Sequence, residues 1–385
     1  MSTSPEQTLR RLTVVVALQW TGSTLGLPLL PLFLEHRGGT PSLIGFIQAS
    51  FFIAGMATQF LAGHFADRFG RRRIAVGGLI LYGVASMTFL LPLHAAWFIG
   101  TRALQGIAAS TFEVAALSAV SSLFPEARRG AAVSRILAAQ LFGVAAGPML
   151  GAVVDVNQLA WAFFVTGLLS LGAAVRSSRL DLGTSHDPDA PLPDLQWSRQ
   201  LIGSLIASAT VGLATGVYEA CWTLLMHAHH ATNLQVRLSW TMFAVPWVAL
   251  SRVGGWLADH ANRRVIVFVG LLNVAFFLGL YPHIHNNVLL LSLGSVEAIA
   301  TSLSMPSIAS MLTQGAHDRE LSRRQGLYST SSTAALALSA GASGVLFSHG
   351  PAIPFTLVAL SSAALGLVAQ LWWRDVPGRV STPTT

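Results

Sequence analysis

Apolar residues recur along the chain in blocks of about 20, and short polar stretches separate the blocks. A helix of about 20 residues rises about 30 Å, which matches the hydrocarbon thickness of a bilayer. Each block therefore predicts one membrane-spanning helix. The chain yields twelve predicted spans, near residues 12–34, 41–64, 74–93, 97–122, 130–154, 158–175, 200–227, 235–257, 264–282, 287–312, 325–347 and 352–373.

One polar stretch, from Ser177 to Arg199, is much longer than the others. It is rich in aspartate and proline and offers little apolar surface to bury, which is typical of a linker. It divides the chain into an N-terminal six-helix half at 1–176, a cytoplasmic linker at 177–199 and a C-terminal six-helix half at 200–385. The predicted fold class is an all-α membrane protein of two six-helix halves.

Composition agrees with this interpretation, because 52% of the residues are hydrophobic and only 10% are charged. A soluble domain carries about a quarter charged residues. All 23 basic residues are arginines, and with the N-terminus in the cytoplasm 20 of them lie on that side; the exceptions are Arg37, Arg102 and Arg237. This asymmetry predicts cytoplasmic termini and explains the net charge of +7 without a nucleic-acid partner. We expect a multi-pass protein of a bacterial-type cytoplasmic (inner) membrane.

The start of the chain has some features of a secretory signal. Arg10 and Arg11 precede an apolar run that starts at Leu12. That run continues past Trp20 to Phe33 without a small-residue cleavage pattern, and many similar blocks follow it. The first block is therefore predicted to be a membrane helix.

The two halves repeat each other in sequence. Asp67, between spans 2 and 3, and Asp259, between spans 8 and 9, stand 192 positions apart in similar Gly-x-x-x-Asp segments. Gly341 and Gly344 of span 11 similarly correspond to glycines of span 5. The repeat indicates a duplicated six-helix unit, and transporters built in this way place their site where the repeats meet.

The segment between spans 2 and 3 resembles the signature loop of the major facilitator superfamily. The matching residues are Gly63, Asp67, Arg68, Gly70, Arg71 and Arg72. The resemblance implies a loop that latches the two halves during the transport cycle. A glycine lets two helices approach closely, an aspartate can face a helix N-terminus, and the arginines can pair with it or with lipid phosphates. The alternative is that the arginines only anchor the topology.

Span 4 carries a second match, Arg102-Ala-Leu-Gln105-Gly106, which the family associates with proton coupling. Arg102 could instead snorkel to the outer interface. Glu113 lies eleven residues further on, close to three helical turns, so Arg102, Gln105 and Glu113 share one face. A charged face is costly against lipid, so we expect it to line the central cavity, with Arg102 tuning the pKa of Glu113.

Span 5 carries a third match, which resembles a motif of the superfamily's exporters and of its drug:proton antiporters in particular. The matching residues are Gly143, Gly147, Pro148 and Gly151. Glycines four positions apart predict a groove for close helix contact, and the proline predicts a bend. Pro28 and Pro31 of span 1 are a weaker match to the same exporters and predict a kink.

Glu113, Glu219 and Glu297 are the acidic residues predicted to lie within spans, namely spans 4, 7 and 10. In the family the first helix of each three-helix unit lines the cavity, and these three spans occupy that place. A buried carboxyl can exchange protons near neutral pH or pair with a cation. The alternative is a neutral glutamate that is hydrogen-bonded within a helix contact. Other candidate cavity residues are Gln19, Trp20, Phe112, Gln140, Tyr218, Trp222 and Trp247.

Metal and cofactor chemistry find little support. Cys221 is the only cysteine, which excludes an intrachain disulfide and a cysteine metal site. Histidines gather at the outer ends of spans 7 and 9 and could bind a metal or sense pH, although solvated loop histidines are far more common. We therefore predict no cofactor and no metal. The cluster comprises His227, His229, His230, His283 and His285.

The sequence thus predicts a monomeric, proton-coupled exporter of drugs or other amphiphilic small molecules that works by alternating access, and not an enzyme. No nucleotide-binding loop is present, so protons and not ATP are the expected energy source. A proton-coupled importer of a metabolite and a lipid or glycolipid flippase on the same fold remain open. A non-transporting protein that kept the fold is a further alternative.

Overall fold

The computed structural model describes residues 4–124, 126–151, 153–182, 197–314 and 318–376, and at some positions within helices it describes the backbone alone. In these ranges the chain is helical and has no strand. It divides into two compact units, Met1–Pro191 with Val236–Leu238, and Leu192–Gln235 with Ser239–Thr385. The division falls inside the predicted linker, whose residues 183–196 lie outside the described residues.

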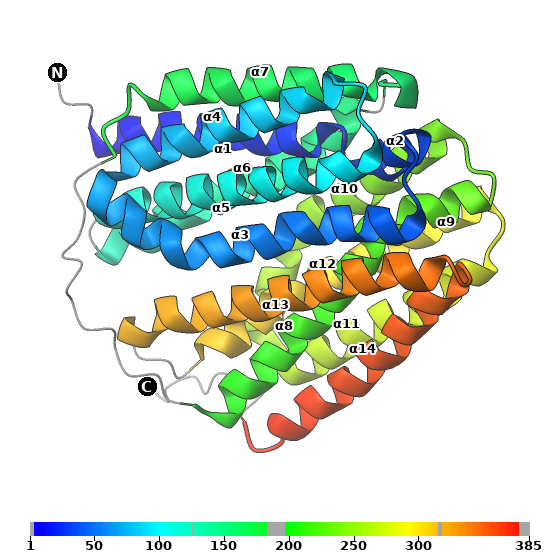
Figure 1. The fold of residues 1–385 in the computed structure, drawn as a ribbon. Helices are drawn as coiled ribbons and strands as arrows, with labels where there is room; N and C mark the ends of the chain where they lie inside the picture. The colour runs from blue at the N-terminus through cyan, green and yellow to red at the C-terminus, as the bar shows by residue number, and fades with distance from the viewer. Residues whose placement is uncertain (1–3, 125, 152, 183–196, 315–317, 377–385) are drawn as a thin grey trace. The chain divides into compact units, whose positions relative to one another are not determined.

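Each predicted span corresponds to a helical segment (Figure 1). The first half comprises α1 (Pro5–Leu25), α2 (Leu30–His36), α3 (Pro41–Phe69), α4 (Arg71–Met87), α5 (Phe98–Leu123), α6 (Glu126–Gly151) and α7 (Leu159–Ser177). The second comprises α8 (Arg199–Val217), α9 (Thr223–Ala228), α10 (Asn233–His260), α11 (Arg263–Leu280), α12 (Asn287–Thr313), α13 (Asp318–Phe347) and α14 (Ala352–Trp372).

Eleven segments in the described part of the chain are long and apolar enough to cross a membrane. The remaining long helix is α10, whose 28 residues exceed the length that a span needs. It contains Arg237 and Arg252, which lower its mean hydropathy. With α10 in its place between α9 and α11, the fold is that of a twelve-helix membrane protein.

Two of the spans are built from two helices each. The first is interrupted after Gly26 by a short 3₁₀ turn, and Pro28 and Pro31 stand at the starts of the 3₁₀ turn and of α2. Proline has no N–H to donate, which accounts for this interruption at the position of the predicted kink. In the second unit α8 continues into α9 through a π-helical turn, Tyr218–Trp222.

In the first unit, α1 packs between α6 and α7, and α4 packs between α5 and α7. The glycines of α6 allow α1 to approach closely, as the sequence predicts. A Cβ added to Gly151 would lie 2.0 Å from the carbonyl oxygen of Leu25, and one added to Gly147 would lie 2.7 Å from that of Thr21. The hydroxyl of Thr24 donates a hydrogen bond to the carbonyl oxygen of Gly143 at 3.1 Å.

In the second unit, glycines of α8 make close backbone contacts with α13. A Cβ on Gly212 or Gly216 of α8 would lie 2.1 Å or 2.5 Å from a carbonyl oxygen of α13. The sequence comparison assigned this role to Gly341 and Gly344 of α13, which are buried. Both halves therefore contain a close helix contact that glycines permit.

Candidate functional site

Glu113 lies on α5 and is partly buried in the first unit. Its Oε1 atom accepts a hydrogen bond from the side-chain amide of Gln140 on α6 at 3.0 Å. Within the described part of the chain Glu113 has no ion-pair partner. The other carboxyl oxygen can therefore take up a proton or contact a positively charged solute. Among the candidate glutamines predicted from the sequence, Gln140 is the one that donates a hydrogen bond to this carboxyl group.

Arg102 lies near the start of α5 and is only 3% exposed. Its guanidinium group donates to the amide oxygens of Gln105 and of Gln48 on α3, both at 3.1 Å. It also lies over the ring of Phe51, 4.3 Å from the centroid. The amide of Gln105 donates in turn to Ser86 of α4 at 2.9 Å. Arg102 is therefore held inside the helix bundle and does not snorkel to the interface.

Arg102 and Glu113 belong to two separate networks. Arg102 is bonded toward α3 and Gln105 toward α4, whereas Glu113 is bonded to Gln140 on α6. The eleven-residue separation also places the two residues about 16 Å apart along the helix axis. The prediction that Arg102 acts on Glu113 therefore needs correction, because their side chains have different neighbours. Sequence reasoning missed Gln48, whose position in an otherwise apolar span was the available signal.

The hydrogen bonds of Arg102 predict that a substitution at this position lowers the stability of the protein even when it keeps the positive charge. We expect Arg102→Lys to lower the thermal unfolding midpoint, because lysine keeps the charge but cannot reproduce the planar fork to two amides. A hydrogen bond to a charged group contributes about 1.5–3 kcal/mol. The measurement is thermal unfolding in detergent, with Arg176→Lys at the exposed end of α7 as control. Equal thermal unfolding midpoints for the two variants would show that the paired hydrogen bonds of the guanidinium group do not contribute to stability.

The remaining candidates of the first unit lie in helix contacts. Gln19 is buried and accepts a hydrogen bond from the hydroxyl of Ser170 on α7 at 2.7 Å. Trp20 packs against the core of the unit, and a Cβ on Gly143 would lie 2.5 Å from its Cβ. Phe112 is 2% exposed within that core. Gln19 and Phe112 are therefore buried in helix contacts within the first unit, and Trp20 is partly buried there.

Glu297 on α12 is the most completely enclosed acid of the second unit that the structure describes, with 2% of its surface exposed. Its two carboxyl oxygens accept separate hydrogen bonds, from the hydroxyl of Tyr218 at 2.7 Å and from that of Tyr281 at 2.6 Å. Tyr281 follows directly after α11, and sequence reasoning missed it. With only four tyrosines in the chain, its apolar setting was the signal that could have identified it.

The π-helical turn Tyr218–Trp222 positions Tyr218 against this carboxyl group and also carries Glu219 and Trp222. Trp222 packs edge-on against Tyr281, with 5.0 Å between ring centroids, and its indole N–H donates to Ser239 of α10 at 2.8 Å. Glu219 lies in the same turn and is partly buried. π-Helical turns occur frequently at functional sites, because the extra residue re-aims the side chains around it. Glu297 is therefore held by side chains from two other spans.

The loop between α3 and α4 turns at Gly70, whose φ of 90° favours glycine. At Gly63 and Asp67 the structure describes the backbone alone. Arg71 is buried at the start of α4 and donates a hydrogen bond to the hydroxyl of Ser122 near the end of α5. Arg68 and Arg72 are exposed. Ser122 is thus a partner of Arg71 that the sequence did not predict, and the predicted pairing with Asp67 lies outside the described residues.

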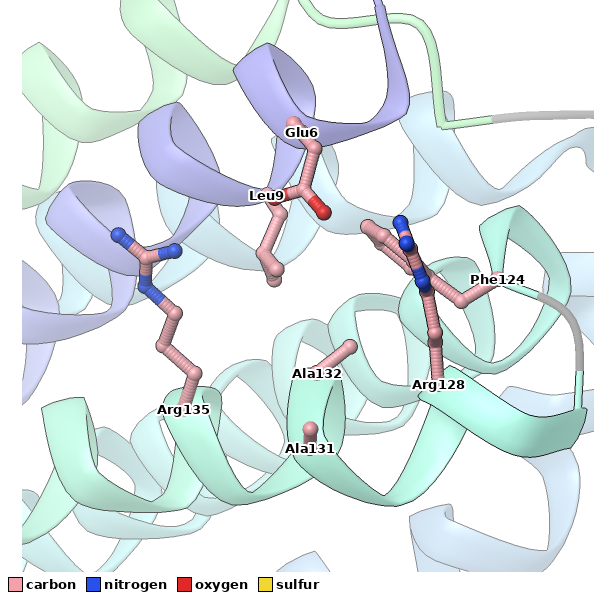
Figure 2. A pocket seen from close by; sticks show the side chains of 7 residues that line it. All are labelled: Glu6, Leu9, Phe124, Arg128, Ala131, Ala132 and Arg135. Carbon is pink, nitrogen blue, oxygen red and sulfur yellow. The ribbon is translucent and has the colours of Figure 1, made fainter.

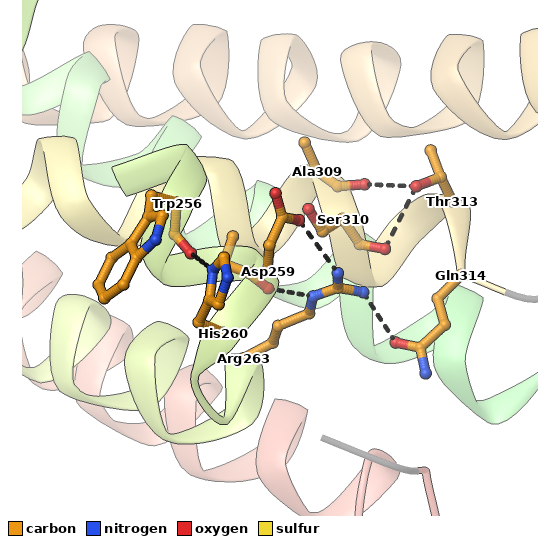
Figure 3. Close-up of polar contacts among 9 residues, drawn as sticks. Trp256, Asp259, His260, Arg263, Ala309, Ser310, Thr313 and Gln314 are labelled. Carbon is orange, nitrogen blue, oxygen red and sulfur yellow. Dashed lines mark hydrogen bonds and ion pairs between the residues drawn. The ribbon is translucent and has the colours of Figure 1, made fainter. Parts of the chain in front are cut away.

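The same arrangement recurs in the second unit. Arg263, the first residue of α11, lies 3.6 Å from Asp259 and donates to the carbonyl oxygen of Ala258 at 2.6 Å (Figure 3). It also donates to the side-chain oxygen of Gln314, at the end of α12, at 3.4 Å. Arg263 stands 192 positions after Arg71, and Gln314 stands 192 positions after Ser122. In each half an arginine therefore joins the start of the third span to the end of the fourth.

The predicted histidine cluster is partly assembled. The rings of His229 and His285 stack with 4.7 Å between centroids, and the side-chain amide of Asn287 donates to the carbonyl oxygen of His229 at 3.1 Å. Burial and the neighbouring His285 lower the pKa of His229, which favours a neutral ring. Among the described residues no group of three or more metal-ligating side chains converges.

Comparison with known proteins places this architecture among membrane transporters. A family model described as Major Facilitator Superfamily matches residues 12–196 and 201–385. A chloramphenicol resistance protein of Pseudomonas aeruginosa is 34% identical over 264 residues, which cover 65% of this chain and 62% of that protein. A chloroplastic sodium-dependent phosphate transport protein of Arabidopsis thaliana is 24% identical over 403 residues, covering 91% of this chain and 74% of that protein.

A solved structure shares the fold at much lower sequence identity. It is a bacterial homolog of the human lysosomal transporter Spinster, in an inward-facing and occupied conformation. It superposes with a TM-score of 0.80 at 12% identity and covers all of both chains. At this identity the likeness concerns the fold alone.

Proposed function

Because this chain belongs to the major facilitator superfamily and is a membrane transporter, we propose that it exports drugs or other amphiphilic small molecules in exchange for protons, by alternating access. The protein acts as a monomer in a bacterial-type cytoplasmic membrane, with both termini in the cytoplasm. Its substrates are lipophilic, and cationic compounds are favoured among them. The arginine asymmetry along the chain supports this orientation.

The observation that carries the proposal is the hydrogen bond between Glu113 and Gln140. A carboxylate paired with an arginine would be held ionised in one place. An amide is a neutral donor that can bond both the charged and the neutral carboxyl group. Glu113 can therefore take up a proton, or release it in favour of a cationic solute. Competition between proton and solute at one carboxyl group is a sufficient basis for antiport.

Two further observations support export as the direction of transport. The Gly147-Pro148 segment of α6 resembles the motif of the superfamily's exporters, and its glycines pack directly on α1. The relative from Pseudomonas aeruginosa is named as a chloramphenicol resistance protein. Removal of a toxic amphiphile from a cell requires outward transport.

Glu297 is the second protonatable group in this proposal. It lies in the second unit and is bonded by Tyr218 and Tyr281. Both carboxyl oxygens already accept a hydrogen bond, so a proton on Glu297 would have to replace one of those bonds. Protonation there consequently changes the contacts between α12 and its neighbours, which links proton uptake to helix movement.

The second candidate function is import of an anionic metabolite. Arg102 is a buried cation within a span, and a positive charge there can attract an anion. The relative from Arabidopsis thaliana, named as a phosphate transport protein, gives this alternative a specific basis. The amides of Gln48 and Gln105 occupy the guanidinium group, however, and make Arg102 part of the helix framework.

One experiment distinguishes the two functions. Purified protein is placed in liposomes that contain a pH-sensitive dye, and an imposed proton gradient is followed while solutes are added. Proton movement triggered by lipophilic cations and neutral drugs supports the exporter. Silence to these compounds, with proton movement alongside phosphate or an organic acid, overturns it in favour of the importer.

A further inference from the structure

The first unit contains a pocket of about 300 Å³ at one end of the contact between α1 and α6. Arg128 and Arg135 of α6 stand on either side of it, and Glu6 of α1 lies opposite (Figure 2). Neither the candidate coupling residues nor the signature loop contributes to it. The floor between these charges is apolar and consists of Leu9, Phe124, Ala131 and Ala132.

The pocket exists because α6 presents small residues where α1 would otherwise pack. Its lining residues on α6 stand at positions 128, 131, 132 and 135, which fall on one helical face. The two middle residues are alanines and leave space beneath Leu9, which is 3% exposed. The arginines at the two ends are exposed and lie two turns apart, about 10 Å along the axis. Two long side chains can converge on one anionic group across that distance.

The charges of the pocket are unequal in number and separated in space. Two guanidinium groups come from α6, and one carboxylate comes from the first turn of α1. A ligand that complements them carries an anionic group opposite the arginines and a cationic group opposite Glu6. Guanidinium groups suit phosphate because their N–H donors match its oxygens in pairs.

The same stripe of α6 becomes apolar beyond the pocket. Phe142 and Met149 follow Arg135 at the same seven-residue spacing and are both at least half exposed. A ligand with its head between the arginines can therefore extend a hydrocarbon chain along the helix. A small water-soluble phosphate would leave this apolar stripe uncovered.

We propose that this pocket binds the headgroup of a phospholipid whose phosphate is followed by a primary ammonium group. The phosphate lies between Arg128 and Arg135, the ammonium group faces Glu6, and an acyl chain runs along Phe142. Phosphatidylethanolamine has this chemistry. Phosphatidylglycerol has the phosphate but lacks the cation.

The test uses full-length protein, purified in detergent and depleted of lipid, and measures thermal stabilisation during titration. The titrants are short-chain phosphatidylethanolamine, short-chain phosphatidylglycerol and soluble phosphoethanolamine. We expect the first to stabilise the protein at the lowest concentration and the soluble headgroup to have no effect in the same range. Equal stabilisation by soluble phosphoethanolamine would overturn the assignment to a lipid.

Variants of the pocket test the contact with the phosphate and the contact with the ammonium group separately. The double variant Arg128→Ala, Arg135→Ala should weaken the apparent affinity for both lipids by at least about tenfold, and Glu6→Gln should remove the preference between them. Arg128→Lys with Arg135→Lys should restore part of the affinity if charge is the main attraction. Exposed arginines at the end of α7, in Arg176→Ala with Arg179→Ala, serve as control. An unchanged lipid preference in Glu6→Gln would refute the proposed pose.

Discussion

Replacing Glu113 with glutamine is expected to abolish proton movement coupled to substrate export and to reduce it to the level of protein-free liposomes. Glutamine has nearly the same shape as the protonated glutamate but cannot release a proton. The amide of Gln140 can still donate to its side-chain oxygen, so the contact between α5 and α6 is preserved. The measurement is dye-reported proton flux on addition of a lipophilic cation.

A second assay of the same variant distinguishes lost coupling from lost folding. Exchange of labelled for unlabelled substrate across the membrane needs no net proton transfer, so a folded Glu113→Gln protein should continue to exchange a neutral substrate. Glu35→Gln, at the exposed end of α2, is the matched control and should retain both activities. Full proton coupling in Glu113→Gln would refute the assignment of Glu113.

Replacing Gly151 with alanine is expected to destabilise the first unit strongly. The added Cβ would lie 2.0 Å from the carbonyl oxygen of Leu25, far inside van der Waals contact. The atom that it meets belongs to the backbone, so α1 and α6 have to separate. Overpacking of this kind costs about 1–3 kcal/mol, and a rigid neighbour places the cost at the upper end. The measurement is the thermal unfolding midpoint in detergent.

Gly172→Ala provides the matched control for this prediction. Gly172 lies within α7, and a Cβ built on it meets no atom within 4 Å. Alanine also has the higher helix propensity, so this variant should be neutral or slightly stabilised. Equal stability of Gly151→Ala and the wild type would mean that the close contact between α1 and α6 is absent from the folded protein.

The two predictions concern different physical properties of neighbouring helices. The Glu113 variant tests whether this residue exchanges a proton. The Gly151 variant tests whether the absence of a side chain at this position is what allows α1 and α6 to pack closely. Gln140 and Gly151 both belong to α6, so a change in the contact between α1 and α6 would also move the donor to Glu113. We therefore expect Gly151→Ala to reduce transport at least in proportion to the amount of folded protein that is lost.

The sequence by itself determined the spans, the repeat and the identity of the acids within the spans. A bilayer has a fixed thickness and offers the backbone no hydrogen bonds, so a helical span can be recognised from its length and composition. A kink at Pro28 and close packing at Gly147 also follow from local chemistry, because a missing N–H or a missing Cβ acts wherever it stands. The 192-residue offset between Asp67 and Asp259 is a property of the amino-acid order alone.

Only the tertiary structure decided which neighbour each polar side chain has. Glu113 and Glu297 were both predictable as acids within spans, but one is bonded to an amide and the other to two tyrosines. Arg102 and Glu113 share a helix, yet Arg102 is bonded to Gln48 on another one. The physical reason is that a hydrogen bond depends on the rotation and spacing of packed helices, and its two partners stand tens of residues apart in the sequence.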